Sequence, residues 1–369
     1  MLRGYFQTNI TPNGRFNYLT NLDSTVNIDP NKYNELRHLG AIYTMGQFMQ
    51  RHPQSDLINT MVSAGDYMKN CCLRPFPLSE KKGLAIWSYP EINGGEKKAC
   101  VKLGANGLGI LAYLAINQIK ERYISPDTLE AMGETILVMQ RENGFFESTY
   151  EDSLQNYDFN FQSLFYPGEA ILALLNLYQF DKNERWLEAA LLSLKYICEQ
   201  RKDQALEELP ADHWILIATH ELFEKVPITY YEADRSLFLE HGKRIVEKII
   251  SEQTLNINTP EINGTFLGIG STTACGARLE ALISFGPWIA EAYPDLDLRL
   301  RNSIHYALCF IQGGVITEGA LKGGITSLPK PVYALQERPA VNQIDNLQHI
   351  MSAWLWAQQR KGWLWPKKD

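Results

Sequence analysis

The stretch LGILAYLAINQI (residues 108–119) decides the fold, because its residues are apolar on nearly every face of a helix. A helix of this kind must be buried on all sides. The following pattern, DTLEAMGETILVMQR (127–141), has apolar residues at i, i+3, i+4 and i+7 with charges elsewhere, which is typical of a helix buried on one side only. The two segments therefore predict an inner helix next to an outer one.

The same alternation recurs along the chain. Segments that are apolar all round, which we expect to be inner helices, occur at 39–49, 108–119, 169–178, 214–223, 272–285 and 350–359. Amphipathic segments, which we expect to be outer helices, lie between them at 56–70, 127–141, 186–201, 233–250 and 296–312. Such self-similarity is typical of an array of helical hairpins. Strand-like stretches such as GRFNYL (14–19) and KACVKL (98–103) are short, so we predict an all-α protein with peripheral β-hairpins.

Composition limits the class of protein and of partner. The 369 residues are 45% hydrophobic, 11% aromatic and 21% charged, as in a packed globular protein of one or two domains. The formal net charge is -7, and Lys and Arg form no basic stripe. Nucleic acids and anionic membranes both recruit clustered basic residues. We therefore expect neither as a partner, and the sequence does not indicate an oligomeric state.

The cysteines and the N-terminus give expectations about compartment and cofactors. The six cysteines have no CxxC spacing that would indicate zinc or a redox pair, and they occur at Cys71, Cys72, Cys100, Cys198, Cys275 and Cys309. Such usage suits a reducing compartment, so we expect a cytoplasmic protein without a metal or cofactor. The start MLRGYFQTNITPNG (1–14) lacks the apolar core of a signal peptide, and no apolar run reaches the length of a membrane span.

Several segments resemble a known group of folds. The six inner helices with their alternating outer helices, and QRENGFFESTY (140–150), resemble the six-hairpin (α/α)6 toroids. FYPGEAILALLNLY (165–178), DHWILIATHEL (212–222), and NGRFNY (13–18) with YNELRH (33–38) also look like a set of bacterial proteins of this fold. The resemblance implies one toroid over residues 1–369, with 1–30 as an extended N-terminal segment packed on it. It specifies the fold and only weakly the chemistry, because the superfamily includes glycosidases, glycan lyases, sugar epimerases and cyclases.

Polar residues cluster at the N-terminal ends of the predicted inner helices. In an alternating toroid all inner helices run the same way, so these ends meet at one mouth, where free helix N–H groups favour anionic groups. As catalytic candidates we take Glu169, Asp212, His213 and His38. As substrate-binding candidates we take Tyr33, Asn34, Arg37, Tyr166, Trp214, Arg278, Arg338, Asp345 and His349.

Each candidate also has an ordinary structural explanation. Glu169 and Asp212 stand where helix-capping residues stand, and capping alone explains either one. A single histidine on an inner helix is usually a hydrogen-bonded core residue, whereas three at corresponding helix ends favour proton transfer. Arginines here either clamp a carboxylate or phosphate, or tie loops to helix ends.

Three functions fit this set of residues. A glycoside hydrolase needs a carboxylic acid and a carboxylate, for which Glu169 and Asp212 are the preferred pair. A sugar epimerase or polysaccharide lyase would instead move a proton with histidine or tyrosine, while arginine or asparagine stabilises the oxyanion. A non-catalytic glycan-binding module would use the same funnel without turnover. We expect a carbohydrate-active enzyme, with hydrolase slightly ahead, acting on a small-molecule or oligosaccharide substrate.

Overall fold

The structure is a computed structural model of the chain. It describes residues 2–21, 33–53, 56–77, 83–94, 96–255, 258, 260–267, 270–319, 321–329 and 341–366. Arg338, one of the predicted substrate-binding residues, lies outside these ranges. No helix in the described ranges combines the length and the apolar character needed to cross a bilayer.

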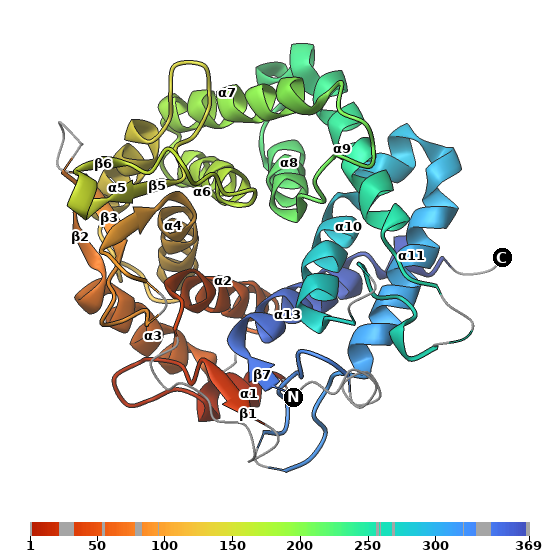
Figure 1. The fold of residues 1–369 in the computed structure, drawn as a ribbon, viewed down its shortest axis with the longest axis horizontal. Helices are drawn as coiled ribbons and strands as arrows, with labels where there is room; N and C mark the ends of the chain where they lie inside the picture. The colour runs from red at the N-terminus through yellow and green to blue at the C-terminus, as the bar shows by residue number, and fades with distance from the viewer. Residues whose placement is uncertain are drawn as a thin grey trace.

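A ring of inner helices surrounds the axis of the molecule (Figure 1). Each packs on the next in chain order, and the last packs on the first, so the ring is closed. These helices are α2 (Glu35–Arg51), α4 (Leu103–Asn117), α6 (Tyr166–Asp181), α8 (His213–Lys225), α10 (Thr272–Ala292) and α13 (Ile344–Gln359). Each predicted inner segment falls on one of these helices. However, α4 begins five residues before the predicted start and ends two residues before the predicted end, and α13 begins six residues before its predicted start.

Outer helices cover the ring (Figure 1). They are α3 (Leu57–Cys71), α5 (Pro126–Val138), α7 (Glu184–Arg201), α9 (Arg235–Ser251) and α11 (Pro294–Gln312), as the amphipathic pattern predicts. The hydrophobic core fills the space between the two layers. The chain is therefore an (α/α)6 toroid. Within the N-terminal segment predicted to be extended, residues 2–21 contain the short helix α1 (Leu2–Thr8) and strand β1 (Leu19–Asn21).

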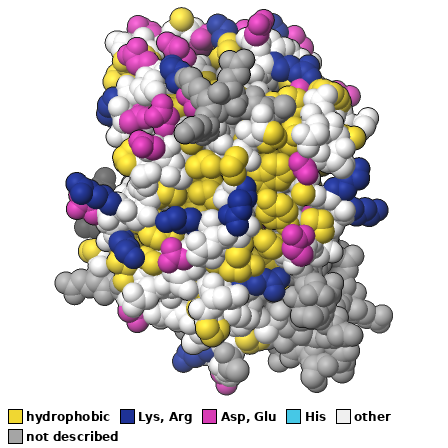
Figure 2. Space-filling view, turned by 90° about the vertical axis from the view of Figure 1, so that its left-hand side faces the viewer, with side chains coloured by type: hydrophobic (Ala, Val, Ile, Leu, Met, Phe, Trp, Pro, Cys, Tyr) yellow, Lys and Arg dark blue, Asp and Glu magenta, His cyan; other side chains and the backbone are white. Residues whose placement is uncertain are grey.

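Short antiparallel strands lie at the periphery. β1 pairs with β7 (Val341–Gln343), which joins two segments far apart in the sequence. A second sheet has the order β2 (Leu73–Pro75), β3 (Leu84–Ser88), β4 (Cys100–Lys102), β5 (Thr149–Glu151) and β6 (Asn156–Tyr157). Figure 2 views the side of the molecule that carries this sheet. On this face of the molecule, hydrophobic side chains form a broad area that is interrupted by single basic and acidic side chains.

Three turns with a glycine connect α1, α5 and α9 to the outer helices that follow them, α3, α7 and α11. Gly14, Gly144 and Gly264 follow α1, α5 and α9, and each has φ close to +90°. A Cβ added at these positions would lie 2.0 Å from Ser63 O, 2.6 Å from Leu192 O and 2.1 Å from Tyr306 O, respectively. These carbonyls belong to α3, α7 and α11, so each turn lies directly against the backbone of the following outer helix. Only glycine combines this φ with such a close approach.

We expect Gly144→Ala to destabilise the protein by about 2 kcal/mol or more, because it adds both φ strain and a backbone clash. The measurement is the free energy of unfolding in urea. Gly362→Ala is the matched control, since a Cβ there meets nothing within 4 Å, and it should not lower stability. Equal stability of the two variants would contradict this account of the turn.

Candidate active site

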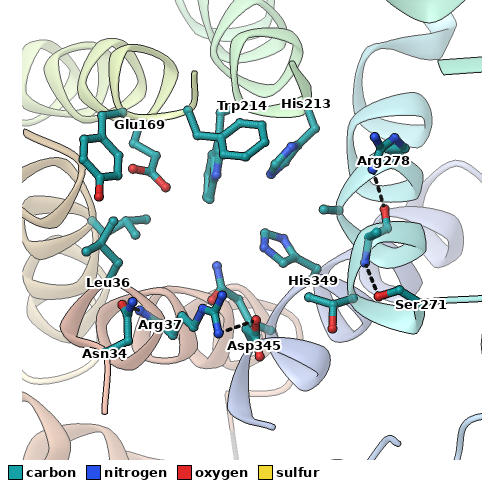
Figure 3. A pocket seen from close by; sticks show the side chains of 17 residues that line it. Asn34, Leu36, Arg37, Glu169, His213, Trp214, Ser271, Arg278, Asp345 and His349 are labelled. Carbon is teal, nitrogen blue, oxygen red and sulfur yellow. Dashed lines mark hydrogen bonds and ion pairs between the residues drawn. The ribbon is translucent and has the colours of Figure 1, made fainter. Parts of the chain in front are cut away.

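A cavity of about 420 Å³ opens at the N-terminal ends of the inner helices (Figure 3). This volume is in the range of small-molecule sites. All six inner helices or the residues just before them contribute to its wall. The predicted site residues that line it are Asn34, Arg37, Tyr166, Glu169, His213, Trp214, Arg278, Asp345 and His349. Convergence of the helix N-termini therefore brings these residues together, as the alternation of the segments predicts.

Two histidines from different helices face each other in this cavity. The rings of His213, at the start of α8, and His349, on α13, are nearly perpendicular with centroids 5.4 Å apart. His213 Nε2 is buried and has no hydrogen-bond partner among the described residues. Burial lowers the pKa of His213 well below its ordinary value, and nearby His349 and Arg278 lower it further. His213 is therefore a neutral imidazole at neutral pH and is able to accept a proton.

His349 is oriented by a buried carboxylate. Its Nδ1 lies 2.9 Å from Glu280 Oε2, on α10. The other oxygen of Glu280 accepts a hydrogen bond of 2.5 Å from Ser352 Oγ. With Nδ1 bonded in this way, the ring of His349 turns its Nε2 away from Glu280 and toward the cavity. Glu280 thus fixes both the orientation of the ring and the nitrogen that is free for chemistry.

Glu169 extends into the cavity from the first turn of α6 (Figure 3). It is only 4% exposed, and its Oε2 has no hydrogen-bond partner in the described part of the chain. Burial, with a smaller contribution from the charge of Asp212, raises the pKa of Glu169 to about 8. The carboxyl group is therefore mostly protonated at neutral pH and is able to donate a proton.

This raised pKa predicts a pH dependence of stability. The ordinary value is 4.5 and the value in the folded protein is about 8. The folded state therefore binds more protons than the unfolded state within this window, and stability falls as the pH rises from about 4.5 to about 8. We expect Glu169→Gln to remove this loss of stability at high pH. The Tm of the variant should exceed that of the wild type by a few degrees at pH 8.5 and differ little at pH 4.5.

Thermal unfolding across this pH range tests the expectation. Glu188→Gln, which changes an exposed glutamate on α7, is the control and should follow the wild type. If the wild type and Glu169→Gln lose stability in parallel as the pH rises, the raised pKa is wrong.

An arginine and an aspartate form the charged side of the cavity. Arg37 Nη1 lies 3.2 Å from Asp345 Oδ2 and donates a hydrogen bond of 2.6 Å to the Tyr18 hydroxyl. Asp345 Oδ1 is buried and has no partner within the described ranges. Burial raises the pKa of Asp345, and Arg37 opposes this shift. Tyr18 and Asp345 thus hold the Arg37 guanidinium beside the cavity, where it can bind an oxyanion.

Asp212, the predicted partner of Glu169, is engaged elsewhere and does not line the cavity. Its Oδ1 accepts a hydrogen bond of 3.2 Å from Ile215 N and caps α8, and its Oδ2 lies 3.0 Å from Arg201 Nη1. Asp212 is therefore a helix-capping residue, which was the structural explanation given for it in the sequence analysis. Its charge acts on Glu169 only at a distance.

His38 and Tyr33 also lie away from the cavity wall. His38 is 1% exposed, with Nδ1 bonded to the Tyr33 hydroxyl and Nε2 2.9 Å from Ala64 O. Both ring nitrogens are thus engaged in hydrogen bonds within the protein. We assign both residues to the packing of α2 and not to the chemistry.

Sequence reasoning missed Phe165, which lines the cavity, and Glu280, which does not line it but is hydrogen-bonded to His349. Glu280 is 2% exposed and stands alone among the apolar residues of TTACGARLEALISF (272–285), so an isolated acid in a buried helix was the available signal. Phe165 precedes α6 and packs on His213 with ring centroids 4.7 Å apart. In the described part of the chain, no group of three or more His, Cys, Asp or Glu side chains is placed to hold a metal ion.

Comparison with known proteins identifies relatives by structure alone. No protein-family model and no curated protein matches the chain. The chain is similar to the structure of a D-mannose isomerase, with a TM-score of 0.69 and 14% identity over 97% of this chain and 95% of that one. It is also similar to a sugar epimerase from a ruminal bacterium (TM-score 0.65, 12% identity, 95% and 94% covered). A third similar structure is the cellobiose 2-epimerase of Bacillus thermoamylovorans (TM-score 0.62, 11% identity, 95% and 97% covered).

The chain has the six-hairpin toroid fold. The likeness spans nearly the full length of each chain, which confirms the predicted fold class. At such low sequence identity the structural similarity shows the fold alone. The reaction has to be argued from the residues in the cavity.

Proposed function

We propose that the protein moves a proton at carbon 2 of a sugar, as an aldose–ketose isomerase or a 2-epimerase. The observation that carries this proposal is the pair formed by His213 and His349, which face each other in the cavity. Proton abstraction next to a carbonyl needs a group that takes a proton from carbon and a group that returns one, and an imidazole can do either. The epimerase was an alternative to the hydrolase in the sequence analysis, whereas the isomerase was not considered there.

The proposed reaction begins with the open-chain aldose. One histidine takes the proton from C2, the C–H electron pair forms the C1=C2 double bond, and the carbonyl electron pair moves to O1. The neutral imidazole of His213 suits the role of base. Return of a proton to C2 on the opposite face gives the epimer. Return of a proton to C1, together with transfer of the O2 proton to O1, gives the ketose.

The developing enediolate needs positive charge close to its oxygens. Arg37 supplies a guanidinium that Asp345 and Tyr18 hold in place, so little reorganisation is needed during the reaction. Glu169, which is protonated at neutral pH, supplies a hydrogen-bond donor on the opposite side of the cavity. The proposal thus assigns roles to His213, His349, Arg37 and Glu169.

The similar structures support the choice of substrate class. Two of these proteins are named for mannose and cellobiose, and they share the toroid in which the present cavity lies. We therefore propose a sugar with a free reducing end as the substrate. A lyase would also abstract a proton with these histidines, but from a uronic acid with loss of the neighbouring glycosidic oxygen.

A glycoside hydrolase is the second candidate, and Glu169 favours it. A buried carboxyl group with a pKa of about 8 has the properties of the acid that protonates a leaving oxygen. Its expected partner, Asp212, is bound to Arg201 and to the backbone of α8. The second carboxylate would then have to be Asp345, which has one free oxygen.

Hydrogen exchange separates these candidates. The protein is incubated in D₂O with a panel of aldoses, ketoses and reducing disaccharides, and deuterium at C1 or C2 is followed by NMR. An isomerase or epimerase incorporates deuterium and interconverts two sugars without cleaving a glycosidic bond. Cleavage without exchange would support the hydrolase, and binding without either reaction would support a glycan-binding module.

A further inference from the structure

A second cavity of about 550 Å³ adjoins the first one. The two share Asn34, at the start of α2, and Tyr166, at the start of α6. The second cavity continues outward over strands β4 and β5, where Lys102 and Thr149 line it, to Phe161 in the segment before α6. A ligand that occupied both cavities would pass Asn34 and Tyr166, the two residues that the cavities share.

The charges in the second cavity compensate one another. Lys98 pairs with Glu151, and the buried Lys102 pairs with Glu96 and also with Glu35, which does not line the cavity. Two further charged side chains of opposite sign line the cavity, Lys97 and Asp158. A wall of this kind offers many hydrogen-bond donors and acceptors but selects for no net charge. It fits a neutral ligand rich in hydroxyl groups better than a phosphate or a carboxylate.

An exposed aromatic ring completes the second cavity. Phe161 is 45% exposed and packs edge to face against Tyr166 with ring centroids 6.2 Å apart. Tyr166 belongs to both cavities, so the aromatic surface is continuous from one to the other. The apolar C–H face of a pyranose ring can cover such a ring and remove it from water.

The position of the histidines sets the direction of the ligand. His213 and His349 lie on α8 and α13, whereas the second cavity adjoins the ends of α2 and α6. A proton transfer at C2 places the reducing end of the substrate at the histidines. The link to any further unit must then leave from an oxygen remote from C1 and C2, such as O4.

We propose that the second cavity binds a neutral sugar unit linked to the reacting one, so that the preferred substrate is a reducing disaccharide or longer oligosaccharide. This inference rests on the proposed function for the direction of the ligand, but not for the presence of the second subsite. Phe161 is assigned the stacking contact with the distal unit.

Binding rather than turnover tests this inference, which keeps its outcome separate from that of the reaction. Calorimetry is used to compare glucose and mannose with cellobiose, lactose and β-1,4-mannobiose, and with a disaccharide whose distal unit is a uronate. We expect a neutral disaccharide to bind at least about tenfold more tightly than its own monosaccharide, and Phe161→Ala to reduce this ratio about five- to tenfold. Phe180→Ala, which removes a similarly exposed ring (43%) outside both cavities, should leave the ratio unchanged.

The possible results each decide the matter. If no disaccharide binds more tightly than its monosaccharide, if the uronate is preferred, or if both phenylalanine variants act alike, the inference is overturned. A neutral disaccharide that binds through Phe161 without hydrogen exchange supports the second subsite and contradicts the proposed reaction. Exchange with monosaccharides alone supports the reaction and rejects the subsite.

Discussion

Replacing His213 or His349 by Asn is expected to reduce kcat/KM for sugar interconversion by about 10³-fold, with loss of deuterium incorporation from D₂O. Asparagine keeps a polar side chain of similar width but cannot transfer a proton near neutral pH. Both variants should retain the wild-type Tm within a few degrees, because the facing sides of the two rings contact the cavity. The rates are measured on the sugar that the exchange assay identifies.

Variants of the neighbouring carboxyl groups make this result specific. Glu280→Gln keeps a hydrogen-bonding group beside His349 but removes the charge, so we expect a smaller loss, about 10- to 100-fold, together with a shifted pH profile. Asp212→Asn should affect stability and leave most of the activity. If the histidine variants stay active while Glu169→Gln and Asp345→Asn are inactive, the hydrolase is the correct function and the histidine pair is not catalytic.

The largest expected effect on stability comes from Lys102. Its Nζ donates a hydrogen bond of 2.9 Å to Glu35 Oε1, and Glu35 is fully buried. Ser88 and Asn93 also donate hydrogen bonds to Glu35, but they bring no charge. Lys102→Met would leave the carboxylate buried without its cation, so we expect a loss of about 3–5 kcal/mol in the free energy of unfolding.

A double variant shows whether the lost charge is the cause. In Glu35→Gln with Lys102→Met neither charge remains, and stability should recover by at least about half of the loss. Lys98→Met is the control, because the same residue type there pairs with Glu151 at the surface and should contribute about 1 kcal/mol or less. A double variant as unstable as Lys102→Met would show that shape, not charge, is what matters at Lys102.

The alternation of helices could be predicted from sequence because burial imposes it directly. A helix surrounded by others has no polar face, and a helix on the outside has one, so each pattern indicates its layer. The start of α4 was missed because LGANG (103–107) is rich in glycine, which is unfavourable in helices. The reason is tertiary, since a Cβ at Gly104 would lie 2.0 Å from Glu169 Oε2 and one at Gly107 2.7 Å from Glu169 O.

The candidate site could be predicted in outline but not in detail. The common direction of the inner helices placed most of the site residues correctly at one mouth. What the sequence could not decide is how each polar residue is used. Asp212 caps α8 and pairs with Arg201 from another helix, whereas Glu169, within the first turn of α6, points into the cavity.

Polar bonds cross the seam where the ring closes, between α2 and α13. Thr44 Oγ1 donates to Gln348 O, and Ser352 Oγ lies 2.7 Å from Gln47 Oε1, a residue 305 positions earlier. During synthesis, α2 leaves the ribosome long before α13, so these groups must stay hydrated until the last inner helix arrives. A nascent chain therefore acquires His349 and Asp345, which the proposed reaction requires, only in the final step of ring closure.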